Sequence, residues 1–116
     1  MSFITYQLSI ELDLPVTVAV GRLGVFEFPA GRYVYTGSAK RNFDARIARH
    51  LRSEKTLRWH VDYLLAASGA KVTAVRRSRR DECALNAATR GRIIVAGFGA
   101  ADCRAGCGSH LKWQGS

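Results

Sequence analysis

Short segments rich in β-branched and aromatic residues fill the first third of the chain, and their pattern predicts strands. The predicted strands cover residues 3–12, 16–20, 25–28 and 32–36. Glycines at positions 21 and 24 mark a turn between the second and third segments, which predicts a hairpin. We expect the early strands to pair as a meander, so that the sheet is largely antiparallel or mixed.

The middle of the chain changes to a helical period. Phe43, Ile47 and Leu51 recur at intervals of four, which places them on one helical face. A short polar side chain before this run, Asn42 or Ser38, is expected to cap the helix. A second helix is predicted from about residue 57 to 67, with a glycine at position 69 after its end.

The last part of the chain predicts one more strand, one more helix and a glycine-rich loop. Residues 71–76 alternate as a strand does, and Asp81 is a suitable cap for a helix that runs to about Thr89. A loop follows at 97–108, and residues 110–113 predict a last edge strand. The expected fold class is α+β, with a small mixed or antiparallel central sheet and about three helices packed on it. A chain of 116 residues forms one such domain, 1–116.

The charge of the chain suggests an anionic partner. Lys and Arg number 18 against 9 Asp and Glu, a formal net charge of +9. The excess is greatest over residues 31–60, which contain eight basic and two acidic residues. Clustered guanidinium groups suit phosphate, so we expect a nucleic acid to bind. General solubility is the alternative explanation.

The cysteines and the N-terminal pattern indicate a reducing compartment. Three cysteines, an odd number, do not predict a disulfide framework. The N-terminus has the pattern of a first strand and not of a signal peptide, and no apolar run reaches the roughly 20 residues of a membrane span. We therefore expect a cytoplasmic protein with no membrane partner.

One segment concentrates groups that suit a phosphate. Tyr35 ends a strand, a Gly-Ser pair follows it, and Arg46 and His50 share a helical face one turn apart. Backbone N–H groups at the start of a helix favour an anion. An ordinary basic, solvated helix with a half-buried tyrosine is an equally simple explanation of these residues.

This segment, with the pattern Y-T-G-S-A-K-x5-R-x3-H from Tyr35 to His50, resembles the second motif and the catalytic helix of GIY-YIG nucleases. Ile4-Thr5-Tyr6 is similar to a degenerate form of their first motif, and Glu82 to their metal-binding glutamate. The stretches at 59–65 and 97–111 resemble the Uri-type branch of that family. The resemblance covers nearly the whole chain and implies the fold of these nucleases.

The resemblance also implies a catalytic set and a metal. Its members are Tyr6, Tyr35, Arg46, His50, His60 and Glu82. Tyr6 would help to deprotonate the attacking water, and nearby positive charge would have to assist it, since a free tyrosine has a pKa near 10. Arg46 would bind the phosphate, and Glu82 would hold a single Mg²⁺ or Mn²⁺ ion. The two histidines would position water or protonate a leaving group.

Each of these residues has a plainer explanation. Tyr6 could be an ordinary sheet aromatic, Glu82 a first-turn acid favoured by the helix dipole, and His60 a structural histidine bonded to Asp62.

The chain departs from the family pattern in three places. The usual glycine of the first motif is absent before Tyr6. Tyr6 and Tyr35 are far apart in the chain, so the segment 16–28 must be an insertion in what is usually a tight hairpin. An insertion that moved Tyr6 out of the site would remove the proposed base. The late asparagine of the family has no clear match, and Asp102 or Ser109 is its nearest substitute.

Two further clusters have candidate roles. Basic residues near the site are expected to contact the nucleic-acid backbone without reading its sequence. They are Lys40, Arg41, Arg49, Arg76, Arg77, Arg79 and Arg80. The second cluster could form a zinc site with three thiolates and one imidazole, although its spacing is loose. Its members are Cys83, Cys103, Cys107 and His110. For His110 alone, orienting the loop or touching substrate is the favoured role.

The sequence thus predicts a metal-dependent endonuclease that hydrolyses phosphodiester bonds in DNA, with RNA as an alternative substrate. DNA is preferred through the resemblance alone. Because the Uri-type branch is sometimes fused to DNA-repair glycosylases, the resemblance also implies a link to DNA repair, with DNA-repair proteins as partners. Since the small domain shows no evident sequence-reading module, we expect structure-directed cutting of single strands, flaps or repair intermediates. Two other functions stay open: a module of the same fold that binds nucleic acid without cutting it, and a zinc-stabilised interaction domain.

Overall fold

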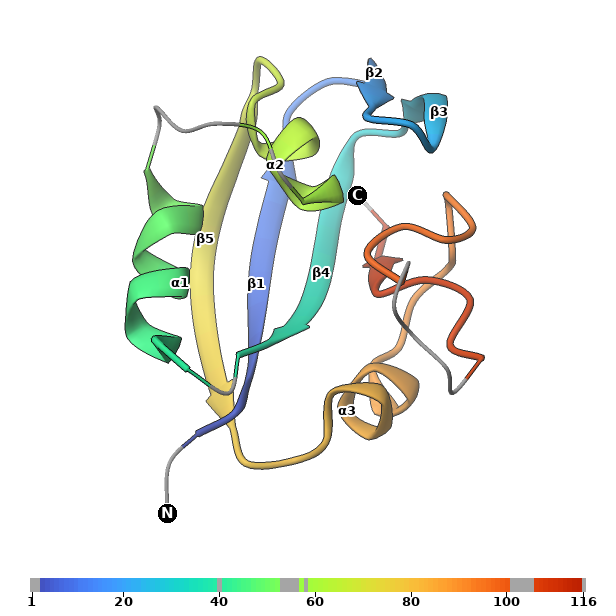
Figure 1. The fold of residues 1–116 in the computed structure, drawn as a ribbon. Coiled ribbons are helices and arrows are strands. Elements are labelled where there is room, and N and C mark those ends of the chain that lie inside the picture. Colours follow the sequence, from blue (N-terminus) through green and yellow to red (C-terminus); the bar gives the residue numbers. More distant parts are fainter. Residues whose placement is uncertain (1–2, 40, 53–56, 58, 101–105, 116) are drawn as a thin grey trace.

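A computed structural model of the protein describes residues 3–39, 41–52, 57, 59–100 and 106–115. Its centre is a four-stranded sheet in the order β5-β1-β4-β6 (Figure 1), and every pairing in it is antiparallel. The four strands are β1 (Thr5–Leu12), β4 (Gly31–Ser38), β5 (Ala70–Ser78) and β6 (Leu111–Trp113). The α+β fold class and the short last edge strand are confirmed.

The predicted hairpin forms, but it does not join the central sheet. Strands β2 (Val16–Val20) and β3 (Gly24–Phe28) pair with each other as a separate two-stranded sheet at the end of the β1–β4 pair (Figure 1). The expected meander is therefore wrong, because β1 pairs with β4 on one side and with β5 on the other. A strand that is buried along almost its whole length, as β1 is, is stabilised more by two hydrogen-bonded neighbours than by one.

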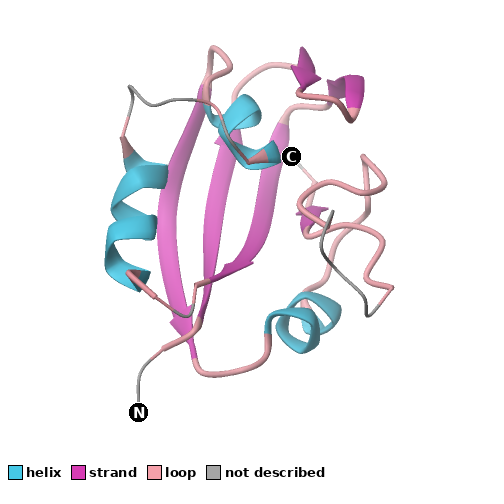
Figure 2. Cartoon of the chain, in the orientation of Figure 1, coloured by secondary structure: helices cyan, strands magenta, loops and turns pink. Residues whose placement is uncertain are grey.

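The described residues form three helices beside this sheet: α1 (Phe43–Leu51), α2 (His60–Leu65) and α3 (Glu82–Ala88). Buried side chains of α1 and α2 join those of β1 in one core cluster, with Ile47 and Leu64 packed together with Leu8 and Ile10. Helix α3 lies next to β4, and most of the described residues after it are loop (Figure 2). Among the residues described, no helix has the length and apolar character needed to cross a membrane.

The observed helix ends agree with the sequence prediction at α3 and differ from it at α1 and α2. Asp81 caps α3 as expected, since its carboxylate accepts a hydrogen bond from the Ala84 N–H. Asn42 precedes α1 in a left-handed conformation, with φ of 53°, and its side chain makes no capping bond. Helix α2 is shorter than predicted, because Asp62 accepts the N–H of Trp59 at 2.8 Å and holds Trp59 extended just before the helix.

Candidate active site

The pairing of β1 with β4 brings two predicted tyrosines together. Tyr6 lies opposite Gly37 and Leu8 lies opposite Tyr35, so both phenols project from the same face of the sheet. Their ring centroids are 6.4 Å apart. Gly37 makes this possible, because a Cβ atom there would lie only 2.6 Å from the Tyr6 hydroxyl. The insertion of β2 and β3 therefore leaves Tyr6 beside Tyr35.

Helix α1 adds His50 to the two tyrosines. The hydroxyl of Tyr6 lies 2.6 Å from Nε2 of His50, a short hydrogen bond in a buried setting. The ring of His50 also packs against Tyr35, with centroids 6.1 Å apart. Its other nitrogen, Nδ1, faces the carboxylate of Asp62 at 3.8 Å. Tyr6, His50 and Asp62 thus form a row that leads away from the sheet.

Ser38 links the arginine and the glutamate of the predicted catalytic set. The guanidinium of Arg46 donates to the Ser38 carbonyl at 2.7 Å, and the Ser38 hydroxyl donates to Glu82 at 2.7 Å. Residues from α1 and α3 are thereby joined through the last residue of β4. From sequence, Ser38 is recognisable as a possible helix cap, and nothing in the sequence shows that Glu82 lies beside it.

Glu82 has a second partner that the sequence did not reveal. Nδ1 of His110, in the C-terminal segment, lies 2.8 Å from its other carboxylate oxygen. Burial by itself would raise the pKa of Glu82, but the hydrogen bonds from His110 and Ser38 and the charges of His110 and Arg46 outweigh it. The net pKa is lowered, so the carboxylate is ionised at neutral pH and is suited to a divalent cation.

Both phenols of the site are harder to ionise than a free tyrosine. Burial raises the pKa of Tyr6 far above its ordinary value, and the positive charge of Arg46 offsets only part of this effect. Burial likewise raises the pKa of Tyr35, and the charges of Tyr6 and Glu82 add to the rise. Arg46 thus acts in the direction that a tyrosine base requires, but its charge does not outweigh the effect of burial on either phenol.

A tryptophan organises the arginines of α1. The Arg46 and Arg49 guanidinium carbons lie 4.7 and 4.2 Å from the Trp59 ring centroid. Arg49 also makes two contacts of 3.0 Å with the fully buried carboxylate of Asp62. A phosphate contact by Arg49, which stays a prediction, would therefore compete with this ion pair. Arg46 is directed to Ser38 instead, and its guanidinium donates to the Ser38 carbonyl.

The ring of Phe98 lies between His60 and Tyr35. Nδ1 of His60 accepts the N–H of Gly99 at 2.8 Å, and the His60 ring packs on Phe98, which in turn contacts Tyr35. Burial lowers the pKa of His60, which keeps the imidazole neutral and able to accept this bond. The alternative of a bond to Asp62 is not what the structure shows, and a structural role for His60 in holding the loop agrees with these contacts.

Except for the partly buried Arg49, the predicted backbone-binding arginines are exposed, but they do not lie on one surface. Arg77 lies opposite Tyr6 and approaches Asp44 of α1 at 3.7 Å, whereas Arg76 lies opposite Gln7 on the other face of the sheet. Arg79 lies over the Phe3 ring. Arg80 is exposed beyond β5, and Arg41 is exposed before α1. Lys40 lies outside the described residues.

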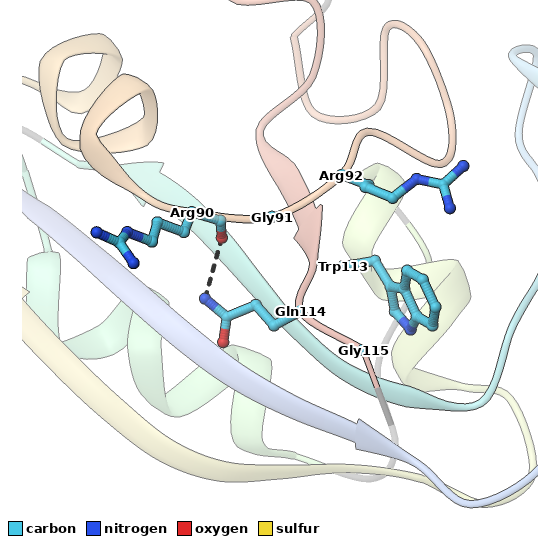
Figure 3. Close-up of a pocket in the computed structure, with 6 residues that line it drawn as sticks. All are labelled: Arg90, Gly91, Arg92, Trp113, Gln114 and Gly115. Atoms are coloured by element: carbon cyan, nitrogen blue, oxygen red, sulfur yellow. Dashed lines mark hydrogen bonds between the residues drawn. The ribbon is translucent and has the colours of Figure 1, made fainter.

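Two hollows lie away from the tyrosines. A groove of about 630 Å³ on the opposite sheet face is lined by Gln7, Ser9, Arg76 and Arg90, among others. A second hollow of about 340 Å³ lies beside β6, where Gln114 donates to the Arg90 carbonyl at 3.1 Å (Figure 3). The guanidinium groups of Arg90 and Arg92 point in opposite directions there (Figure 3). Neither hollow is lined by the residues around Glu82.

The predicted cysteine cluster assembles in part. Donor atoms of Cys83, Cys107 and His110 all lie within 4.8 Å of one another, close enough to hold a metal ion. Cys103, the fourth predicted ligand, lies outside the described residues, as does Asp102. Because His110 also contacts Glu82, this cluster adjoins the tyrosine and arginine site.

The assembled site therefore contains Tyr6, Tyr35, Arg46, His50 and Glu82, with Ser38 and His110 as additional members. Comparison with curated proteins gave no match, and neither did comparison with solved structures. Over residues 5–116 the chain matches the family described as "Domain of unknown function DUF123". Since this match spans almost the whole chain, the protein belongs to the DUF123 family.

Proposed function

We propose that this protein is a GIY-YIG-type endonuclease of the Uri branch, which hydrolyses phosphodiester bonds in DNA with Mg²⁺. The observation that supports it most is the convergence of five side chains that are scattered in the sequence. Tyr6, Tyr35 and His50 touch one another, and Ser38 joins Arg46 to Glu82. Ser38 directly follows Gly37, which lies against the Tyr6 hydroxyl, so the two groups belong to one site.

Glu82 fits the requirements of a magnesium ligand. It is half-buried and ionised, and its hydrogen bonds hold the carboxylate in one orientation. Mg²⁺ commonly binds through one carboxylate together with phosphate oxygens of the substrate and water. When bound there, the ion would polarise the phosphate and the attacking water. Mn²⁺ has similar ligand preferences and is the alternative ion.

Arg46 is the group placed to receive the phosphate. Its guanidinium is fixed by Ser38 and by the Trp59 ring, and it is partly accessible. A planar guanidinium donates to two phosphate oxygens and stays charged throughout the reaction. It would therefore stabilise the negative charge that develops on those oxygens in the transition state.

Tyr6 and His50 form a proton relay in this proposal. Since burial disfavours the Tyr6 phenolate, the tyrosine would not be a base that is already deprotonated before the reaction. Instead, water attacks phosphorus while its proton moves to the Tyr6 oxygen, and the Tyr6 proton moves to Nε2 of His50, 2.6 Å away. The phosphorus–oxygen bond to the leaving group breaks, and solvent protonates the departing alkoxide. Asp62, 3.8 Å from Nδ1, favours the resulting imidazolium.

The nuclease proposal is tested with labelled duplex, flap, single-stranded DNA and RNA incubated with the protein. We expect cleavage with Mg²⁺ or Mn²⁺ and none with EDTA or with Ca²⁺, whose longer bonds and looser geometry do not suit this chemistry. Faster cutting of flaps or single strands would agree with structure-directed cutting in DNA repair. DNA binding without cleavage under every metal condition would instead favour a binding module and overturn the proposal.

The relay makes a separate prediction. Tyr6→Phe and His50→Gln are each expected to lower the single-turnover rate by about 10²- to 10⁴-fold, the range typical of a lost proton-transfer group. Because the two residues act as one unit, the double variant should be little slower than the slower single variant. Multiplicative losses would show that they act independently and would contradict the relay. Tyr33→Phe, which alters a buried phenol bonded to the Pro29 carbonyl, is the matched control.

A further inference from the structure

The cysteines and His110 form a second site beside the one described above. Cys83 is the second residue of α3, whereas Cys107 and His110 come from the loop that leads into β6. Their donor atoms lie within 4.8 Å of one another although the residues come from separate segments. Zn²⁺ favours thiolate sulfur and imidazole nitrogen as ligands, whereas Mg²⁺ and Ca²⁺ favour oxygen.

The orientation of His110 favours a metal ligand. Nδ1 lies 2.8 Å from the Glu82 carboxylate, so it carries the proton and donates it. The lone pair is then on Nε2, which is fully buried. A histidine that donates one N–H to a carboxylate and presents the other nitrogen to the ion is the usual arrangement at zinc.

The two segments that supply the ligands are already fixed against each other. Asn86, one turn after Cys83, donates to the Ser109 carbonyl at 2.8 Å. The His110 N–H donates to the Phe98 carbonyl, and the Gly97 N–H to the Gly108 carbonyl. Ligands of a tetrahedral zinc lie about 3.5–3.8 Å apart, given bonds of about 2.3 Å to sulfur and 2.0 Å to nitrogen. Small side-chain rotations would therefore close the site without moving the backbone.

We propose that Cys83, Cys107 and His110 bind one Zn²⁺ ion, and that this ion orients Glu82 through His110. The ion would have a structural role: it joins α3 to the C-terminal segment and keeps the His110 proton on the nitrogen that faces Glu82. Zinc binding does not depend on the proposed nuclease activity. Only the effect of the zinc ion on Glu82 as a magnesium ligand rests on the proposed nuclease activity.

The test measures metal content and not cleavage. Tag-free protein, purified in reducing buffer without added metal, should contain about one zinc per chain, and chelation should lower its melting temperature. Apo protein titrated with Co²⁺ should develop the near-ultraviolet absorption of thiolate-to-cobalt charge transfer. Cys107→Ser should lose both signals, whereas His60→Gln, which removes a histidine outside the cluster, should keep both.

A Glu82→Gln variant separates this proposal from the magnesium site. Because Glu82 would not contact the zinc directly, the variant should still bind one Zn²⁺, with an affinity weakened by about 10- to 100-fold. Zinc binding would persist in a protein that cleaves no nucleic acid, so the two proposals can fail separately. Wild-type apo protein that takes up neither Zn²⁺ nor Co²⁺, or Cys107→Ser protein that binds zinc as tightly as wild type, would overturn the zinc site.

Discussion

Substitution of Glu82 by glutamine is expected to lower Mg²⁺-dependent cleavage by at least about 10³-fold, which corresponds to the several kcal/mol that a bound metal contributes. The amide keeps nearly the same shape and still accepts a hydrogen bond from Ser38. It removes the negative charge that the divalent ion needs. The effect should therefore appear in the rate and not in the fold.

The measurement is a single-turnover rate with excess enzyme, together with DNA affinity from fluorescence anisotropy without metal. We expect unchanged or slightly tighter DNA binding, because a negative charge near the phosphate is lost. Glu27→Gln is the matched control, since Glu27 is exposed on β3, away from the site. A Glu82→Gln protein that cleaves within about tenfold of the wild-type rate would rule out Glu82 as the metal ligand.

Substitution of Arg46 by alanine should have the second-largest effect, a loss of about 10²- to 10³-fold in the cleavage rate. The guanidinium is expected to contribute most in the transition state, when negative charge on the phosphate oxygens is greatest. Arg46→Lys should restore only part of the rate, since a single ammonium group does not reproduce two parallel hydrogen bonds.

The control for Arg46 must match its loss of charge. Arg22→Ala removes one positive charge from the exposed turn between β2 and β3 and should leave the rate close to wild type. Because Arg46 also contacts Ser38 and Trp59, the melting temperature of each variant should be measured as well. Equal losses of rate in Arg46→Ala and Arg22→Ala would indicate general electrostatic attraction and contradict a specific role.

Local features of the fold were predictable from sequence where short-range rules decide them. Asp81 is recognisable as the cap of α3 because a short carboxylate side chain just before a helix readily accepts a backbone N–H of the first turn, here that of Ala84. The β2–β3 hairpin was recognised from the glycines in its turn. In the candidate site, the spacing of Arg46 and His50 places them on one helical face, and in the structure His50 contacts Tyr6 while Arg46 donates to the Ser38 carbonyl.

Long-range contacts were not predictable in the same way. The meander was wrong because the sequence does not specify which strands become neighbours of β1, and burial on both sides favours β4 and β5. The same limit applies to the arginines after residue 75. Alternation along β5 places Arg76 and Arg77 on opposite faces, which follows only once the strand and its partner are known.

The sequence by itself thus determined the fold class, the helical spacing of α1 and the types of residue available for phosphate chemistry, since these depend on periodicity and side-chain chemistry. Only the tertiary structure decided that Ser38 and His110 hold Glu82, that Asp62 engages Arg49, and that burial keeps the tyrosines protonated. The physical reason is that hydrogen bonds and desolvation act over a few ångströms in space. Residues that are distant in the chain come within that range only after the sheet has formed.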